Sequence, residues 1–446
     1  MNRLLGALAW TSALAGLAVA SPALADDAPR AATAEDVALP ATLTLDEAMR
    51  TFKTRGLDLL LADAQVTRAE GDVLAARAVA NPNVSVGAGA AIDYSPPAGC
   101  VGCQSWTLTV QVSDNGALFD TLTGKRGLRA SSARAALAAA RLGRVDAERL
   151  VGAQVKQQYA QLVVAKASQD FSLEVQKAMT QSLDLNKLRY PSVINEGDLA
   201  RIEVQKLEAD QSVDQAKLAV RQAQAGIAFL LGVRGTVPDF DVERTLLKFR
   251  IPASLQAASE ASLVAIAVST RADLRAWGYT RESAEHSLAL ARRERFPDVG
   301  LFANYTQYGT GPDAVQPPTV TIGLSFNLPV FYQQQGEVRR AEADVATATV
   351  SREKALAQVV SDVAAAWATW VAARDQVQRM ETLILDRAKR ARDIVDLQFR
   401  GGTATLMDFL DAERTYIATN EEYLQDLASY WGALYALEQA VGAELK

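Results

Sequence analysis

Two aspartates near residue 410 have a spacing that places both carboxylates on one face of a helix. In the stretch 399–413, Gly401 and Gly402 interrupt a long helical pattern, and Asp408 and Asp411 follow three residues apart. Residues with this spacing are neighbours on a helix surface. Carboxylates that are held close repel each other, which raises the pKa of some of them and favours bound cations. The chemistry that this stretch offers is therefore electrostatic.

A second copy of the arrangement lies near residue 200. Gly197 precedes Glu203 by the same spacing that separates Gly402 from Asp408. The rest of the chain can be described as two long arms built around these two bends.

The other reactive residues give no catalytic constellation. His286 is the only histidine and lies in a polar helical stretch, which favours a solvated or structural role. Cys100 and Cys103 are the only cysteines, and in an exported chain their spacing favours a small disulfide loop. A zinc half-site and a redox pair are the alternatives for these cysteines. With no phosphate-binding motif and no further metal-ligand spacing, we predict no enzyme, no metal site and no cofactor.

The composition and the first residues limit the class of protein. The chain has 446 residues, 49% of them hydrophobic, and its net charge of −6 argues against a nucleic-acid partner. Arg3, an apolar run and an Ala-x-Ala site at 23–25 predict a signal peptide over 1–25, followed by a flexible lead over 26–42. Beyond it, no apolar run approaches the ~20 residues of a membrane-spanning helix. A membrane role would therefore use strands or a partner.

The remaining chain repeats one order of elements. Thr44 and Glu47 form a capping-box pattern at the start of the first helix. Apolar residues then alternate with small or polar ones in a β-hairpin, and proline-free helical stretches follow. Repeat 1 spans 43–232, and its hairpin, long helix and return helix are expected at 83–113, about 117–189 and about 199–231.

Repeat 2 follows a connector with two prolines at 233–258. The segments that lead into the two hairpins correspond, with Pro82 and Pro297 at matching places. In the second long helix, apolar residues recur every three or four positions, which predicts a coiled-coil-like seam. Repeat 2 spans 259–446, and its hairpin, long helix and return helix are expected at 298–328, about 336–400 and about 405–441.

The predicted hairpins have the dimensions of membrane strands. Transmembrane β-strands have about 9–11 residues and one continuous apolar face. Aromatic residues such as Trp106, Tyr305 and Phe331 lie near the strand ends, where they would form an interfacial girdle or pack in a core. Four strands cannot close a barrel, and open edges in lipid would leave backbone groups without partners. Oligomerisation is therefore required if the hairpins span a membrane.

The signal peptide, the tandem repeat and the glycine-to-acid bend in both halves resemble the outer-membrane efflux protein family, the TolC family. The resemblance covers essentially the whole mature chain. It implies a mostly α fold with a transmembrane β part: a homotrimer pools its strands into a twelve-stranded outer-membrane β-barrel, which a periplasmic α-helical barrel continues. The connector 233–258 and the chain termini would supply an equatorial belt. The implied partners are outer-membrane lipid, a periplasmic adaptor (membrane fusion protein) and an inner-membrane pump of RND or ABC type.

The same resemblance gives the bend of repeat 2 a role. The residues 406–412 match the family segment x-x-Asp-x-x-Asp-Ala at the periplasmic gate. Asp408 and Asp411 would then form acidic rings at a constriction, with Glu203 at the corresponding place in repeat 1. The alternative is that both aspartates only support the positive N-terminal end of the restarted helix.

The bends also depart from the family pattern. Phe399 and Ala404 stand where the family's latch has a tyrosine hydroxyl and an arginine. That latch would be absent or rebuilt, with Arg400 or Arg201 as its basic group. The bend glycines lie where the family meets its adaptor, and each is also compatible with an ordinary helix end. These adaptor-contacting candidates are Gly197, Gly401 and Gly402.

The sequence therefore predicts a passive exit duct of a tripartite efflux or type I secretion system. Its location would be the outer membrane, with an extension into the periplasm. One alternative is an outer-membrane component dedicated to heavy-metal cation efflux. The alternative of another class is a periplasmic coiled-coil adaptor or structural protein, which would have one helical hairpin rather than a duplicated one.

Overall fold

A computed structural model describes most of the chain, and all the elements below belong to one unit, Val37–Lys446. The expected signal peptide, residues 26–38 of the lead, and both Cys100 and Cys103 lie outside the described residues. The described residues are 39–90, 95, 98, 106–192, 194–309, 316–326 and 328–445.

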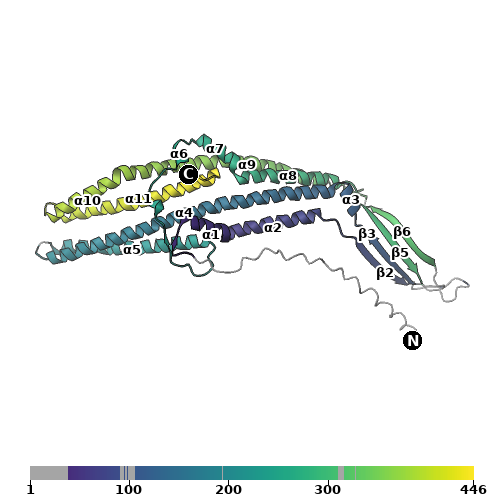
Figure 1. The fold of residues 1–446 in the computed structure, drawn as a ribbon, viewed down its shortest axis with the longest axis horizontal. Helices are drawn as coiled ribbons and strands as arrows, with labels where there is room; N and C mark the ends of the chain where they lie inside the picture. The colour runs from purple at the N-terminus through teal and green to yellow at the C-terminus, as the bar shows by residue number, and fades with distance from the viewer. Residues whose placement is uncertain are drawn as a thin grey trace, which may run out of the picture. The chain divides into compact units, whose positions relative to one another are not determined.

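The two hairpins form one antiparallel sheet. β2 (Asn83–Ala90) pairs with β3 (Trp106–Ser113), and β5 (Val299–Tyr308) pairs with β6 (Gln316–Phe326). β3 also pairs with β5, so the strand order is β2-β3-β5-β6 and the edges are β2 and β6 (Figure 1). The described parts of the first hairpin's two strands have 8 residues each.

The register divides this sheet into an apolar face and a polar face. One row across the four strands consists of Val86, Val110, Tyr305 and Val320. Because neighbours along a strand point to opposite faces, the adjoining row lies on the other side. That polar row consists of Gly87, Thr109, Thr306 and Thr319. On β6 the apolar side chains are largely exposed, 74% for Ile322 and 59% for Leu324, so this chain alone leaves the apolar face uncovered.

Repeat 1 places two helices before its hairpin and three after it. The capping box predicted at its start is confirmed: the Glu47 amide donates to Thr44 Oγ1 (3.2 Å), and the Thr44 amide donates to Glu47 Oε2 (3.0 Å). The helices are α1 (Leu45–Arg55), α2 (Leu57–Arg77), α3 (Ala117–Leu122), α4 (Lys125–Arg189) and α5 (Glu196–Leu230). The stretch expected as one helix from about 117 is divided, because Gly124 adopts a φ of 73° between α3 and α4.

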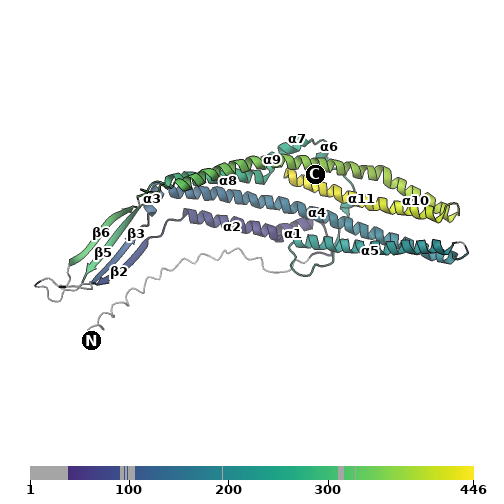
Figure 2. The same ribbon diagram turned by 180° about the vertical axis from the view of Figure 1, so that it is seen from behind.

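Repeat 2 has the same order of elements around its hairpin. The long helix expected at about 336–400 runs through a π-helical turn, a local insertion that often marks a functional position in a helix. The helices are α7 (Glu260–Thr270), α8 (Ala272–Arg293), α9 (Gln335–Arg379), the π turn η3 (Met380–Ile384), α10 (Leu385–Arg400) and α11 (Leu406–Val441). Both the α4–α5 bend and the α10–α11 bend lie at the end of the helices that is opposite the sheet (Figures 1 and 2).

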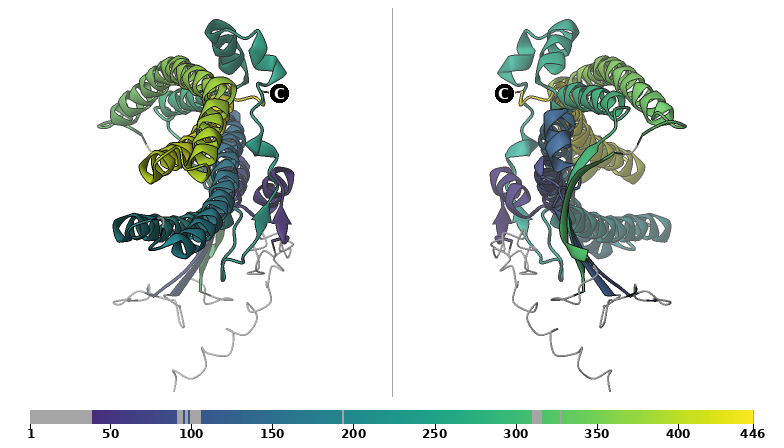
Figure 3. Two further views of the ribbon diagram at one scale, coloured as in Figure 1. Left: turned by 90° about the vertical axis from the view of Figure 1, so that its left-hand side faces the viewer. Right: turned by 90° about the vertical axis from the view of Figure 1, so that its right-hand side faces the viewer.

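The connector carries short elements beside the middle of the long helices. β1 (Thr42–Leu43) pairs in parallel with β4 (Asp241–Val242), and η1 (Thr245–Leu247) and α6 (Ala253–Gln256) follow. In the view along the helices, the connector and the C-terminus lie on the same side of the long helices as α1 (Figure 3).

Buried aromatic residues of the long helices hold the connector in place. The Trp431 indole donates to the carbonyl of Leu246 in the connector (2.6 Å). The Tyr159 hydroxyl donates to the carbonyl of Leu43 (3.0 Å) in β1, which pairs with β4 of the connector. Both aromatic side chains belong to the largest hydrophobic cluster of the described residues and are at most 3% exposed. A buried Tyr or Trp contributes a large apolar area, and the hydrogen bond of its O–H or N–H fixes the position of the group that it contacts. The connector is therefore part of the main core.

One helical segment meets the length and hydropathy of a membrane-spanning helix. Gln335–Arg400 contains an 18-residue window of mean hydropathy 1.3, of which 17% is buried. The sequence predicted no membrane-spanning helix because it has no unbroken apolar run of that length after the expected signal peptide. In this helix, scattered alanine and valine raise the mean hydropathy without forming such a run. In this structure α9 packs against α7, α8 and α11.

Candidate functional site

The bend of repeat 2 closes on its two glycines. Gly401 ends α10, and Gly402 has a φ of 74°, a left-handed conformation that glycine adopts without strain. The Gly402 amide donates to the Phe399 carbonyl (3.1 Å), and the Thr403 amide donates to the Gln398 carbonyl (2.9 Å). These bonds satisfy the last carbonyls of α10 and reverse the chain. The helix break predicted at the paired glycines is confirmed.

Asp408 belongs to the cap of the helix that restarts. The Asp408 amide donates to Thr405 Oγ1 (3.2 Å), while its carboxylate accepts from the Thr405 hydroxyl (2.6 Å) and the Thr405 amide (3.0 Å). These hydrogen bonds lower the pKa of Asp408, since they favour the charged form. The alternative role foreseen for this residue, support of the helix N-terminus, is present in the structure. Asp408 therefore remains ionised and exposed beside the bend.

The bend of repeat 1 is built differently. Asn195 caps α5 by accepting a hydrogen bond from the Asp198 amide on its Oδ1 (2.8 Å). Gly197 therefore lies in the first turn of a helix, and the expectation that it ends a helix is wrong. A Cβ added at Gly197 would lie 3.2 Å from Asn195 Oδ1, which is tight. The glycine leaves room for the capping side chain.

A small hydrophobic cluster, here called the tip cluster, brings the two bends together. Phe399 and Phe409 stack with ring centroids 5.0 Å apart and planes at 15°. Phe399 therefore serves as a packing residue at the place where the family pattern has a tyrosine. The buried members of the tip cluster are Leu183, Ile202, Leu406, Phe409 and Leu410, with Leu199, Val395 and Phe399 packed against them.

Asp411 lies in a groove between the return helices of the two repeats. This groove, about 360 Å³ in volume, is lined on the α5 side by Ala200, Arg201, Val204 and Gln205 and on the α11 side by Met407, Leu410, Asp411 and Arg414. Its acid thus shares the space with two arginines. The Arg414 guanidinium lies 3.7 Å from Glu208, so a contact between the two repeats runs along the groove.

The basic residues proposed for a rebuilt latch pair within their own helices. Arg400 binds Asp396 (2.8 Å), and Arg201 lies 3.5 Å from Asp198. Glu203 is exposed on α5. Within one chain, the apolar tip cluster joins the two bends. Of the two possibilities, an absent or a rebuilt latch, Arg400 and Arg201 do not form a rebuilt one between the repeats.

Sequence reasoning missed a buried acid one turn beyond the bend. Glu413 is only 7% exposed. Burial raises its pKa, and the charges of Asp396 and Asp393 add to this effect, although Arg392 opposes it. The signal was available, because Glu413 follows Phe409 and Leu410 at helical spacing and so falls on the apolar face of α11.

Replacing Glu413 with glutamine is expected to stabilise the folded protein at neutral pH. A carboxyl whose pKa is raised by folding binds its proton more tightly in the native state. Its charged form therefore lowers the free energy of unfolding at neutral pH. This penalty disappears as the pH falls through the folded pKa toward the unfolded value of about 4.3. The Glu413→Gln variant should have a higher denaturation midpoint at pH 7.5, with the difference shrinking near pH 4. Glu422→Gln, exposed on the same helix, is the control. A lower midpoint would contradict the argument.

Comparison with known proteins agrees with this geometry. Residues 263–443 match the family model described as outer membrane efflux protein. No curated protein matches the chain significantly. Among solved structures, the chain is similar to CusC, with a TM-score of 0.72 and 16% identity, over 90% of this chain and 92% of that chain.

Two further channels share the fold. The outer membrane protein VceC from Vibrio cholerae matches with a TM-score of 0.68 and 20% identity, over 90% of this chain and 97% of that chain. The MtrE outer membrane channel of Neisseria gonorrhoeae matches with a TM-score of 0.71 and 18% identity, over 92% and 94%. At these identities the structures establish the fold, while the match over residues 263–443 is to the family itself. The duplicated hairpins and helical arms also do not fit the single hairpin expected of an adaptor. Residues 263–443 therefore match the outer membrane efflux protein family, and the chain has the fold of these outer-membrane channels.

Proposed function

We propose that this protein is the outer-membrane exit duct of a tripartite efflux or type I secretion system, extending into the periplasm. The observation that carries the proposal is the four-stranded sheet, with its exposed apolar face, its polar face and its two open edges. A lipid-facing row beside a water-facing row is the pattern of a transmembrane β-barrel. The duct itself would be passive and would not act as an enzyme.

The open edges support a trimer. β2 and β6 each have one unpaired side, which lipid would not tolerate. Three copies would pair β2 of one protomer with β6 of the next and close a twelve-stranded barrel. The exposed valines and isoleucine would then face outer-membrane lipid.

The two bends are the proposed contact surface for the other components of the system. A periplasmic adaptor would contact the chain reversals at Gly197, Gly401 and Gly402, and an inner-membrane pump of RND or ABC type would supply the energy. The support is geometric, because both bends lie at the end opposite the sheet and the tip cluster holds them together.

Fractionation of cells tests the duct directly. We expect the protein in the outer membrane as a trimer that heat and detergent dissociate. Recovery as a soluble periplasmic monomer would overturn the proposal. A trimer in the outer membrane that forms no conducting channel in planar bilayers would also count against it.

The acids at the bend are proposed to form the constriction. Asparagine keeps an oxygen that accepts the Thr405 bonds, so Asp408→Asn removes charge while retaining the cap. In planar bilayers, Asp408→Asn and Asp411→Asn should each raise the single-channel conductance. Each should also weaken the block by divalent cations about tenfold, the effect of one lost charged contact. Glu422→Gln on the same helix should leave the currents unchanged. If the asparagine variants also conduct like the parent, these acids lie outside the constriction and Asp408 serves as a cap alone.

A further inference from the structure

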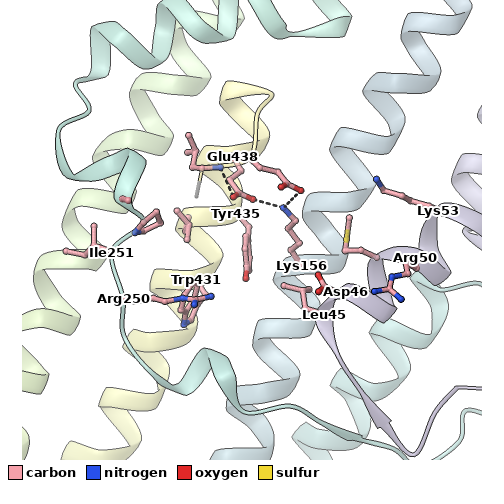
Figure 4. A pocket seen from close by; sticks show the side chains of 16 residues that line it. Leu45, Asp46, Arg50, Lys53, Lys156, Arg250, Ile251, Trp431, Tyr435 and Glu438 are labelled. Atoms are coloured by element: carbon pink, nitrogen blue, oxygen red, sulfur yellow. Dashed lines mark hydrogen bonds and ion pairs between the residues drawn. The ribbon is translucent and has the colours of Figure 1, made fainter.

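A cavity of about 780 Å³ lies beside the middle of the long helices, far along α11 from the bend. Its walls come from α1, α4, the connector and the C-terminal part of α11, so both repeats contribute (Figure 4). This volume is within the range of small-molecule sites, which are mostly apolar with a few placed polar groups. The cavity is separate from the bends and from the sheet.

Aromatic rings of α11 and two cations form one wall of this cavity. Trp431 and Tyr435 are stacked with centroids 6.1 Å apart. The Arg250 guanidinium lies 5.8 Å from the Trp431 ring centroid, and the Lys156 ammonium lies 5.6 Å from that of Tyr435. Each ring is therefore next to a positive charge, which it holds by a cation–π contact.

Several polar groups of the cavity are already committed. Trp431 donates its only N–H to the carbonyl of Leu246 (2.6 Å). Lys156 binds Glu438 (2.8 Å) and lies 3.8 Å from Glu444, so its single positive charge is shared by two carboxylates. These groups form part of the wall, but most of their hydrogen-bonding capacity is used within the protein and is not available to a ligand.

Two groups on the same wall remain available. Among the described residues, Arg250 has no carboxylate partner within ion-pair distance, and the Tyr435 hydroxyl has no hydrogen-bond partner. Burial raises the pKa of Tyr435, so its hydroxyl stays a donor at every physiological pH. An arginine fork beside a tyrosine hydroxyl is suited to a carboxylate or a similar oxyanion.

The opposite wall adds further charge. Arg50 and Lys53 point from α1 toward the cavity (Figure 4). Lys53 is also paired with Glu148 (2.9 Å). Asp46 in the first turn of α1 also lines the cavity, so this wall carries charges of both signs.

We propose that this cavity binds a small organic anion that has an aromatic body and a carboxylate head. The body would lie against Leu434 and the aromatic wall, and the head would accept hydrogen bonds from Arg250 and Tyr435. Such a ligand would bridge α1 and α4 of repeat 1 with α11 of repeat 2. Its occupancy would therefore stabilise the packing of the two repeats.

Calorimetric titration of the full-length protein in lipid nanodiscs tests the site. The probe is 2-naphthoate, and its neutral amide, 2-naphthamide, has the same body without the charge. We expect 2-naphthoate to bind once per protomer and to raise the melting temperature, since a ligand of the native state alone stabilises it. 2-Naphthamide should bind at least tenfold more weakly.

Matched variants locate the binding. Arg250→Gln should weaken 2-naphthoate binding about tenfold, and Tyr435→Phe about threefold, because each loses one hydrogen bond to the head. Lys248→Gln, an exposed change in the same connector that does not line the cavity, should bind like the parent. Circular dichroism verifies that each variant is folded. Equal affinity for acid and amide, or unchanged binding by Arg250→Gln, would overturn the proposal and leave the proposed duct unaffected.

Discussion

Replacing Ile322 with lysine is expected to reduce sharply the amount of assembled protein in the outer membrane. Ile322 lies near the middle of β6, on the apolar face of the sheet, and is 74% exposed in one chain. A lysine at the lipid-facing midplane of a barrel costs about 2–4 kcal/mol, and a trimer would carry three of them. The measurement is the heat-dissociable trimer in outer-membrane fractions, compared with the parent.

The neighbouring residue is the matched control. Thr321 is on the same strand, but its pairing with Asn304 places it in a polar row on the opposite face. Thr321→Lys should therefore assemble like the parent, because its ammonium would face water. If the two lysine variants assembled equally well, or if Thr321→Lys were the defective one, the assignment of the two faces would be wrong.

Replacing Arg271 with methionine is expected to lower the free energy of unfolding by about 3 kcal/mol, as for a buried ion pair that loses one partner. Arg271 is 5% exposed and donates to both carboxylate oxygens of Asp273 (3.0 and 2.6 Å) and to Asp362 (2.9 Å). Methionine would fill similar space but leave both carboxylates without this partner. Denaturant unfolding of the detergent-solubilised protein measures the loss.

Arg271 also helps to hold the C-terminal end of α11. The last carbonyls of a helix have no partner within the helix. Here Arg271 lies 3.4 Å from the carbonyl of Ala440, Thr270 donates to that of Val441 (2.9 Å), and Arg149 donates to that of Gln439. Three neighbouring carbonyls are thus bonded by side chains from outside α11, and the Arg271→Met variant would lose the bond to Ala440.

The effect of Arg271 should depend on pH with a definite sign. Burial alone would raise the pKa of Asp273, but the hydrogen bonds and charge of Arg271 outweigh it, so the pKa is lowered. An acid of this kind contributes stability above its unfolded pKa of about 3.9, and the contribution is lost as the pH falls through the lower folded value. The gap between parent and Arg271→Met should therefore narrow below about pH 3.9. Arg275→Met, exposed one turn along α8, should have little effect at any pH.

The local features of the fold follow closely from the sequence. The capping box at Thr44, the break at Gly401 and Gly402 and the restart behind Thr405 each depend on interactions within a few residues. Period-two alternation placed both hairpins, and the absence of proline indicated the long helices. Such features can be predicted from the sequence because interactions between residues close in the chain determine them.

Other local details could not be predicted because they depend on small energy differences. The division of 117–189 at Gly124 and the π turn at Met380–Ile384 both interrupt sequences that favour helix. The sequence allows Gly197 to end a helix, whereas in the structure Asn195 caps α5 and the helix already includes Gly197 in its first turn. In each place a helical pattern was compatible with more than one boundary.

By itself, then, the sequence determined two bends with acids, two hairpins and the order of the arms between them. Tertiary structure decided which of these parts meet. It joined the hairpins through β3 and β5, set Phe399 against Phe409, buried Glu413, and built the cavity beside Arg250 from segments distant in the chain. The physical reason is that burial, pKa shifts and cavities are set by contacts between distant residues, and the periodicity of one segment carries no information about its partner.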